Sequence, residues 1–453
     1  MIWFFFLLYM QGPQQADLLI TDGTVVTMDP SMRVMEKGAL AIKEGKIAAI
    51  GTTAEITRDW RGKRIKAQNS IIMPGLINTH THAPMTLFRG LSDDQPLKIW
   101  LEQYIWPAEA EFVDAETVRI GTELAAAEMI RSGTTTINDM YFYMDVVGKV
   151  MERAGMRAVI GESLIDFPTP NGKTPDEGLA YTRELIAKWK GHDRIHVAVS
   201  THSPYTCSPE LLKKAKALAD EFDLGLQIHL SETVNEVNTI QERYGATPVG
   251  HLHKLGLLYD GLMAAHGVHL TDADRKLLAE HKVGVSHNPE SNMKLASGAA
   301  PVPELLAIKA EVGLGTDGAA SNNDLDMFEA MDSAAKLQKV MRGDPSLLNA
   351  RDVVRMATIG GAEVLGLDDQ IGSLEAGKQA DIIIIPLNKP HLTPMYDPYS
   401  LLVYAVSGGD VDTVMVQGKI LMENGKLKTL DEASILKEAR QTAARIRDKV
   451  LQK

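Results

Sequence analysis

The sequence predicts a (β/α)₈ barrel, or TIM barrel, joined to a smaller β domain that both ends of the chain build together. In the central part, residues 73–368, eight short apolar runs alternate with stretches of helical period, as expected for a barrel of eight parallel strands. Short β-like runs separated by glycine turns occupy residues 16–72 and return in residues 369–425. Residues 426–453 have the composition of a surface helix.

The eight apolar runs of the central part are each followed by a helical pattern. In chain order the runs cover residues 70–77, 134–140, 157–162, 195–202, 225–229, 262–266, 283–287 and 312–317. The helices expected between them include residues 115–132, 176–190, 209–222 and 272–281. In the N-terminal part, Asp22-Gly23 and Glu44-Gly45 predict hairpin turns, because such pairs tolerate a positive φ.

Composition excludes several classes of protein. The 453 residues hold 47 Lys and Arg against 59 Asp and Glu, a net charge of −12, whereas nucleic-acid polymers are bound through Lys and Arg. Cys207 is the single cysteine, so neither an intrachain disulfide nor a cysteine-based zinc cluster can form. The same count excludes the zinc deaminases that use a P-C-x-x-C signature.

The first ten residues are the single membrane-like stretch of the sequence. They are apolar, but about 20 apolar residues are needed to span a bilayer. No Lys or Arg precedes the stretch and no small-residue cleavage site follows it, although a secretory signal has both. We therefore expect a cytoplasmic protein without a membrane partner.

The apolar runs end near side chains that can bind a metal ion. In chain order these are His80, His82, Asp139, Glu162, His202, His229, His266, His287 and Asp317. Barrel enzymes assemble their active sites at the C-terminal ends of the strands. A buried polar group without a partner costs about 1–3 kcal/mol, so a purely structural barrel would not place one at every strand end. The set predicts a functional site, in which the role of His287 is left open.

His80 and His82 are the first candidate metal ligands. Residues i and i+2 of a strand share a face, so both imidazoles can reach one ion. The other pair with this spacing, His251 and His253, lies in a helical run, where the two side chains diverge.

Three further residues complete the candidate site. Taken singly, each of His229, His266 and Asp317 is more readily explained as a polar group satisfied by hydrogen bonds at a strand end than as a metal ligand. Together with the first pair they make an open site of nitrogen and oxygen ligands, which suits Zn²⁺ or Fe²⁺ with a free position for water.

Four motifs carry a resemblance to a known family. They are residues 74–90, which read PGLINTHTHAPMTLFRG, the HSPY motif at 202–205, the HLSE motif at 229–232, and the GTDGAASN motif at 315–322, with the run that ends at His266. Together they resemble the amidohydrolase superfamily, and within it the methylthioadenosine/S-adenosylhomocysteine deaminases. The resemblance covers residues 16–425 and implies a metal-bearing barrel with a composite β-sandwich.

The resemblance implies a single metal ion. Carried over residue by residue, its ligands are His80, His82, His229 and Asp317. No lysine stands at the end of the fourth run, where members with two metal ions carry a carboxylated lysine. Zn²⁺ is the expected ion, with Fe²⁺ and Mn²⁺ as alternatives.

The resemblance also implies a deamination mechanism. A divalent cation lowers the pKa of its water, and Glu232 takes the proton and passes it to a ring nitrogen of a purine. Asp317 orients the water and His266 stabilises the oxygen that develops at C6, after which ammonia leaves. The alternative for Glu232 is a solvated carboxylate at the start of a helix.

Substrate binding is assigned to three residues by the same resemblance. Glu109 would accept hydrogen bonds from the ribose hydroxyls, while His202 and Glu232 would contact the substrate. Trp100 and Trp106 are left out of the site, because aromatic residues at this spacing are more often core residues. The expected partner is a small nucleoside, and the chain is expected to form a homo-oligomer.

The chain departs from the family at one point. Members that accept S-adenosylhomocysteine carry arginines after the third strand, but Glu162 stands where the first is expected and residues 166–173 contain none. A negative charge there would repel the substrate carboxylate. We therefore expect methylthioadenosine, adenosine and 5′-deoxyadenosine to be preferred over S-adenosylhomocysteine.

Two alternative functions stay open. The same residues could serve a guanine, pterin or triazine amidohydrolase, although a free base would not need Glu109. A non-catalytic scaffold of the same fold is disfavoured, because the four expected ligands are present together with Glu232 and His266.

Overall fold

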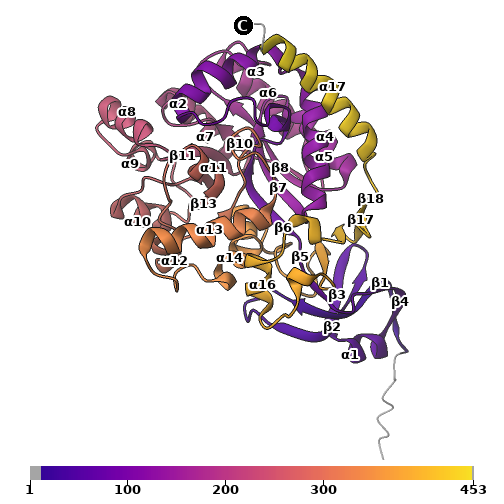
Figure 1. Ribbon diagram of the computed structural model, residues 1–453. Coiled ribbons are helices and arrows are strands. Elements are labelled where there is room, and N and C mark those ends of the chain that lie inside the picture. The colour runs from indigo at the N-terminus through magenta and orange to yellow at the C-terminus, as the bar shows by residue number, and fades with distance from the viewer. Residues whose placement is uncertain (1–11, 451–453) are drawn as a thin grey trace, which may run out of the picture.

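The barrel is one sheet of parallel strands in sequence order. The computed structural model describes residues 12–450 of the chain (Figure 1). Neighbouring strands pair in parallel; they are β6 (Leu76–Thr81), β7 (Thr134–Tyr141), β8 (Arg157–Leu164), β9 (Ile195–Val197), β10 (Val199–Thr201), β11 (Leu226–Leu230), β12 (Leu262–His266), β13 (Gly284–His287) and β14 (Val312–Leu314). Because β9 and β10 follow each other in the chain and both pair with β8, they together fill the fourth of the eight strand positions. At the closing edge Asp317 N donates to His80 O at 3.0 Å, so the segment after β14 lies beside β6. The predicted barrel is confirmed.

Burial explains why the barrel strands show no regular alternation of apolar and polar residues. Apart from β9, every residue of these strands is buried. A parallel strand covered on both faces has no solvent side on which polar residues would alternate.

Helices surround the barrel (Figure 1). In chain order they are η1 (Ala83–Phe88), α2 (Leu97–Ile99), η2 (Trp100–Ile105), α3 (Trp106–Phe112), α4 (Ala115–Arg131), α5 (Met144–Ala154), α6 (Pro175–Trp189), α7 (Pro209–Phe222), α8 (Val234–Tyr244), α9 (Pro248–Lys254), α10 (Asp272–Glu280), α11 (Pro289–Lys294), α12 (Val302–Ala307), α13 (Met327–Arg342), α14 (Ala350–Met356) and α15 (Ile359–Val364). Among them, α2, η2 and α3 lie over the C-terminal end of the barrel. The expected helices are α4, α6, α7 and α10. Of these, α6, α7 and α10 begin after Thr174, Ser208 and Thr271, whose hydroxyls each accept a backbone N–H of the first turn, as N-cap residues do.

The second sheet joins the two ends of the chain. Its strands are β1 (Gln14–Val26), β2 (Val34–Lys43), β3 (Lys46–Thr52), β4 (Trp60–Lys66), β5 (Ser70–Pro74), β15 (Ile382–Pro386), β16 (Thr413–Val416), β17 (Lys419–Glu423) and β18 (Lys426–Leu427), accompanied by α1 (Thr53–Asp59), η3 (Pro390–Leu392), α16 (Pro398–Tyr404) and η4 (Gly408–Asp410). The join is the antiparallel pairing of β15 with β5, and Ile72 and Ile382 pack in one buried cluster. The composite β domain is confirmed, whereas its division from the barrel at residues 72/73 and 368/369 stays a prediction.

Two local predictions are wrong. Asp22-Gly23 is not a hairpin turn, because β1 runs through it; Asp22 has a φ of 70° and the pairing with β2 shifts register there, which is a β-bulge. Residues 70–77 are not one strand, because β5 belongs to the composite sheet and β6 to the barrel. Residues 70–77 are buried throughout, so burial does not separate the two strands. The turn predicted at Glu44-Gly45 does connect β2 to β3, with φ values of 52° and 77°.

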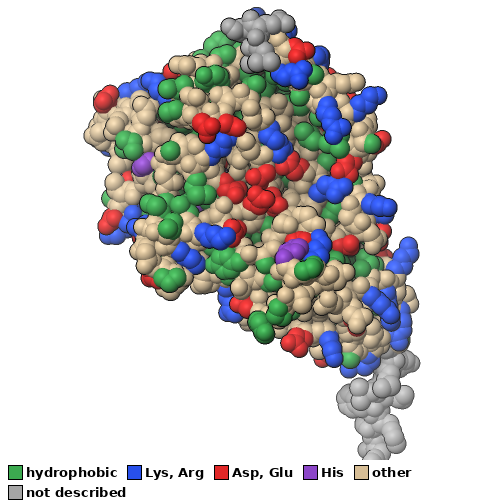
Figure 2. Space-filling model, in the orientation of Figure 1, with side chains coloured by type: hydrophobic (Ala, Val, Ile, Leu, Met, Phe, Trp, Pro, Cys, Tyr) green, Lys and Arg blue, Asp and Glu red, His purple; other side chains and the backbone are tan. Residues whose placement is uncertain are grey.

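The last helix, α17 (Glu432–Val450), lies against α4 (Figure 1). Arg131 Nε is 2.6 Å from Glu432 Oε1, and Arg119 Nη2 is 2.6 Å from Glu438 Oε2. On the face shown in Figure 2, Lys and Arg side chains are interspersed with Asp and Glu. Within residues 12–450, no helix is both long enough and apolar enough to cross a membrane. The apolar residues 1–10 lie outside the described part of the chain.

Candidate active site

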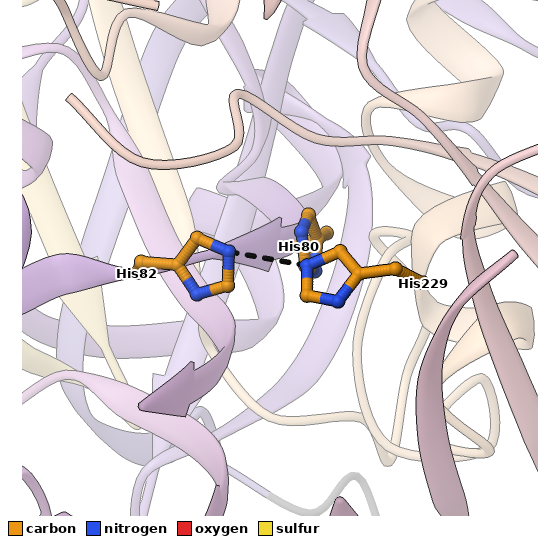
Figure 3. Close-up of side chains that lie close together, drawn as sticks. All are labelled: His80, His82 and His229. Atoms are coloured by element: carbon orange, nitrogen blue, oxygen red, sulfur yellow. Dashed lines mark hydrogen bonds between the residues drawn. The ribbon is translucent and has the colours of Figure 1, made fainter. Parts of the chain in front are cut away.

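Four of the predicted side chains meet at the C-terminal end of the barrel. His82 Nε2 is 3.3 Å from His229 Nε2 (Figure 3) and 3.2 Å from Asp317 Oδ1. His80 Nε2 is 3.5 Å from the same carboxylate oxygen. Although these residues come from β6, β11 and the segment after β14, three imidazole nitrogens and one carboxylate oxygen point at one another. This arrangement can hold a metal ion.

Backbone carbonyls orient two of the imidazole rings. His82 Nδ1 is 2.5 Å from Met140 O, and His229 Nδ1 is 2.6 Å from His202 O. A ring that donates through Nδ1 presents the lone pair of Nε2 to the centre, which is how histidines that bind metals are commonly held. His80 Nε2 is buried and makes no hydrogen bond to any described residue.

Asp317 is held by donors that sequence reasoning missed. Ser291 Oγ and Ser321 Oγ donate to its Oδ2 at 2.6 and 2.9 Å, while Gly318 N donates to Oδ1 at 2.7 Å. Burial alone would raise the pKa of Asp317, but the adjacent imidazoles of His80 and His82 outweigh burial and hold the pKa well below its usual value. The carboxylate is therefore ionised and ready to bind a cation.

Glu232 and His266 lie beside this cluster. His266 Nε2 is 3.8 Å from Glu232 Oε2, and His266 Nδ1 is 2.9 Å from Asn292 Oδ1. Only 6% of Glu232 is exposed, and burial raises the pKa of its carboxyl above the usual value. A raised pKa makes the ionised carboxylate a stronger proton acceptor, as a general base requires.

A pocket opens above the cluster and includes the predicted substrate-binding residues. His202 and Glu109 line it together with Glu232. Burial raises the pKa of Glu109 to about 7, although the nearby Tyr141 hydroxyl and His82 lower it in part. The structure therefore brings all the predicted site residues to one place.

The structure adds an aromatic wall to the pocket. Trp100 and Trp106, which the sequence analysis left out, both line it. The rings of Trp106 and Phe167 meet edge to face with their centroids 5.1 Å apart. Phe167 comes from the loop after β8, so no pattern local to Trp106 could have indicated this pair.

The side chain of Glu162, which was expected to repel a substrate carboxylate, does not line the pocket. Glu162 is 2% exposed, accepts a hydrogen bond from Met144 N at 3.2 Å and is absent from the pocket lining. Burial raises the pKa of Glu162 to about 8. The expected repulsion of a substrate carboxylate by Glu162 is therefore wrong. Among the described residues that line the pocket there is still neither arginine nor lysine.

The structure also places the second histidine pair and His287, whose role the sequence leaves open. His251 lies in α9 and stacks on Tyr244 with centroids 4.0 Å apart, so the helical interpretation of the second histidine pair is correct. His287 is fully buried and neither of its ring nitrogens bonds a described residue, and it does not line the pocket.

Known proteins of similar sequence cover nearly the whole chain. The sequence profile of the amidohydrolase family matches residues 71–421. The 5-methylthioadenosine/S-adenosylhomocysteine deaminase 1 of Syntrophus aciditrophicus is 50% identical over 96% of this chain and 98% of its own length. The 5′-deoxyadenosine deaminase of Methanosarcina acetivorans is 46% identical over 94% of this chain and 98% of its own length.

A solved structure has the same fold. It is an adenosine deaminase from Xanthomonas campestris with bound zinc, 41% identical, with a TM-score of 0.95 over 96% of this chain and all of that one. The family profile covers more than half of this chain and the relatives match it nearly from end to end. The protein belongs to the amidohydrolase family.

Proposed function

We propose that the protein is a metal-dependent hydrolytic deaminase that converts the 6-amino group of an adenosine-type nucleoside into a 6-oxo group and releases ammonia. The observation that carries this proposal is the convergence of His80, His82, His229 and Asp317 next to the Glu232–His266 pair at the base of one pocket. The relatives named as deaminases of methylthioadenosine and 5′-deoxyadenosine support the same reaction.

We infer that the four converging residues hold one divalent cation, with Zn²⁺ as the proposed ion and Fe²⁺ or Mn²⁺ as alternatives. The fit rests on His80 Nε2, a buried polar atom without a hydrogen-bond partner among the described residues, and on donors that catalytic zinc commonly uses. When bound, a divalent cation acts as a Lewis acid and lowers the pKa of its water toward about 7.

The protein side chains move the protons. Glu232 takes a proton from the attacking water and gives it to N1 of the purine ring, because its carboxyl is buried and has a raised pKa. The second water proton passes to the amino nitrogen as the C6–N bond breaks, so that ammonia leaves and the oxygen stays on C6 as the 6-oxo group. His266 lines the pocket and stabilises the oxygen that forms at C6, while Asn292 Oδ1 holds the other ring nitrogen, Nδ1. Asp317 orients the water with one carboxylate oxygen, while Ser291 and Ser321 hold the other.

The pocket wall selects the substrate. Glu109 accepts hydrogen bonds from the two ribose hydroxyls, and His202 contacts the base. The wall beyond them carries Trp106 and Phe167, and the described residues that line the pocket include neither lysine nor arginine. An apolar 5′-substituent is therefore buried favourably, whereas a zwitterionic one loses its hydration without a cationic partner for its carboxylate. We propose that methylthioadenosine and 5′-deoxyadenosine are better substrates than S-adenosylhomocysteine.

The test is an assay of adenine ultraviolet absorbance with methylthioadenosine, adenosine, 5′-deoxyadenosine and S-adenosylhomocysteine. Glu232→Gln should lose on the order of 100- to 10,000-fold in kcat, the range expected of a general acid–base group. Glu242→Gln, an exposed position of α8, is the matched control and should keep full activity.

Each other outcome points to a different function. If no nucleoside is turned over although a cation is bound, the guanine, pterin or triazine alternatives replace the proposal. If neither turnover nor bound metal is found, the protein is a scaffold. Equal turnover of S-adenosylhomocysteine and methylthioadenosine would refute the proposed role of the apolar wall. The expected homo-oligomer stays a prediction that light scattering can test.

A further inference from the structure

The loop after β11 carries Glu232 in a strained turn. Ser231, between the strand and Glu232, has a φ of 54°, a left-handed conformation that few residues other than glycine adopt. Such a conformation costs about 1–3 kcal/mol and persists when the surroundings hold it. Something must therefore fix the Ser231–Glu232 peptide.

A buried carboxylate from α8 holds this turn. Glu236 Oε1 accepts a hydrogen bond from Ser231 N and Glu236 Oε2 accepts one from Glu232 N, both at 2.8 Å. Glu236 is 1% exposed. Its two oxygens thus fix two consecutive N–H groups, which sets both the position and the tilt of the backbone that carries Glu232.

The other side of the same turn is tied to the loop that follows His266. Ser231 O accepts hydrogen bonds from Val268 N at 3.1 Å and from His269 N at 2.8 Å. The loop that carries Glu232 and the loop that follows His266 therefore meet at Ser231, and Glu236 holds that meeting point from the helix side.

Simple helix capping does not account for these contacts. The N-cap residue of α8 is Thr233, whose hydroxyl accepts a hydrogen bond from Glu236 N at 3.2 Å. The Glu236 carboxylate reaches back beyond Thr233 to Ser231 and Glu232. In α10, by contrast, Asp274 donates its N–H to Thr271 and its carboxylate accepts from Thr271 N, which is an ordinary capping box.

We propose that Glu236 is a positioning residue that sets the geometry of Glu232 for proton transfer. The effect on kcat rests on the proposed function, whereas the effect on the backbone of Ser231 and Glu232 does not. Glu236 does not line the pocket, so substrate affinity should not depend on it. A displacement of Glu232 of about 1 Å can cost on the order of 100-fold in rate.

The test compares Glu236→Gln and Glu236→Ala with Asp274→Asn. The two Glu236 variants should lower kcat by about 10-fold and about 100-fold, with KM within about twofold of the unaltered protein. The glutamine variant keeps one acceptor and should be the less impaired of the two. Asp274→Asn removes a comparably buried carboxylate, 2% exposed, and should leave kcat unchanged.

A second measurement is independent of catalysis. Amide hydrogen exchange of the peptide that contains Ser231 and Glu232 should be at least about 10-fold faster in Glu236→Gln, because a native hydrogen bond is lost, and unchanged in Asp274→Asn. Equal exchange in Glu236→Gln and the unaltered protein would overturn the inference. So would an unchanged kcat, or a raised KM with kcat intact. Absence of any nucleoside turnover would instead remove the proposed function and leave the exchange result to decide the role of Glu236.

Discussion

Arg157 and Asp381 form a buried ion pair that ties the barrel to the composite sheet. Arg157 Nε is 3.1 Å from Asp381 Oδ2, and the two side chains are 0% and 3% exposed. Arg157 begins β8, whereas Asp381 stands just before β15 and also accepts a hydrogen bond from Gln417 N at 2.7 Å. Residues 224 positions apart are thereby joined.

Breaking this pair from one side should destabilise the protein strongly. We expect Asp381→Ala to lower the free energy of unfolding by about 3–5 kcal/mol, because it leaves the buried Arg157 guanidinium without its opposite charge. The double variant Arg157→Met/Asp381→Leu should recover much of that loss. Chemical denaturation followed by circular dichroism measures both, and a single variant as stable as the unaltered protein would contradict the prediction.

Loss of one imidazole should empty the proposed metal site. We expect His229→Ala to bind less than a tenth of the zinc bound by the unaltered protein, since catalytic zinc sites depend on three protein ligands. The thermal midpoint of the unaltered protein should fall on chelation and return with zinc. Metal content by mass spectrometry is the readout. His251→Ala, in α9 and outside the cluster, is the matched control and should retain its metal.

Glu109 should lower KM only for nucleosides whose ribose carries hydroxyl groups. We expect Glu109→Gln to raise KM for adenosine by about 10- to 100-fold, because it removes charge-assisted hydrogen bonds worth about 1.5–3 kcal/mol. The effect on 2′,3′-dideoxyadenosine should be small, since that nucleoside lacks both hydroxyls. Glu102→Gln, at an exposed position of η2, is the control. An equal effect on both nucleosides would show that Glu109 does not bind the ribose.

Asp410 should make stability depend on acid pH. Burial would raise its pKa, but hydrogen bonds with Lys389, His391 and Ser407 outweigh burial and lower the pKa from 3.8 to about 2. A carboxyl with a lowered folded-state pKa adds stability that is fully present above the unfolded value and is lost as the pH falls through the folded value. We expect Asp410→Asn to cost on the order of 1–2 kcal/mol at pH 7.

The pH profile is the check on this assignment. The difference in unfolding free energy between Asp410→Asn and the unaltered protein should shrink as the pH falls from about 5 toward 2, because both forms then carry a neutral group. A difference that is independent of pH would mean that the side chain acts through its shape alone.

Several features could be predicted from local sequence. The β11 run and the GTDG motif led to His229 and Asp317 because strand ends in a barrel converge by construction. The assignment of β5 and β6 to different sheets could not be predicted, because residues 70–77 are buried throughout. Pro74-Gly75 marks a break in the run, but a local turn signal does not show which sheet each half joins. Ser291 and Ser321 also escaped prediction, since a serine that donates to Asp317 looks like any other serine.

The sequence by itself determined the eight-stranded barrel, the composite sheet and the identity of the side chains at the strand ends. Those features follow from burial and periodicity, which act along a short stretch of chain. Only the tertiary structure decided that Glu162 turns away from the pocket, that Trp106 meets Phe167 above it, and that Glu236 holds the turn below Glu232. These depend on distances between side chains far apart in the chain or on the path of a loop, and a pattern of neighbouring residues does not contain them.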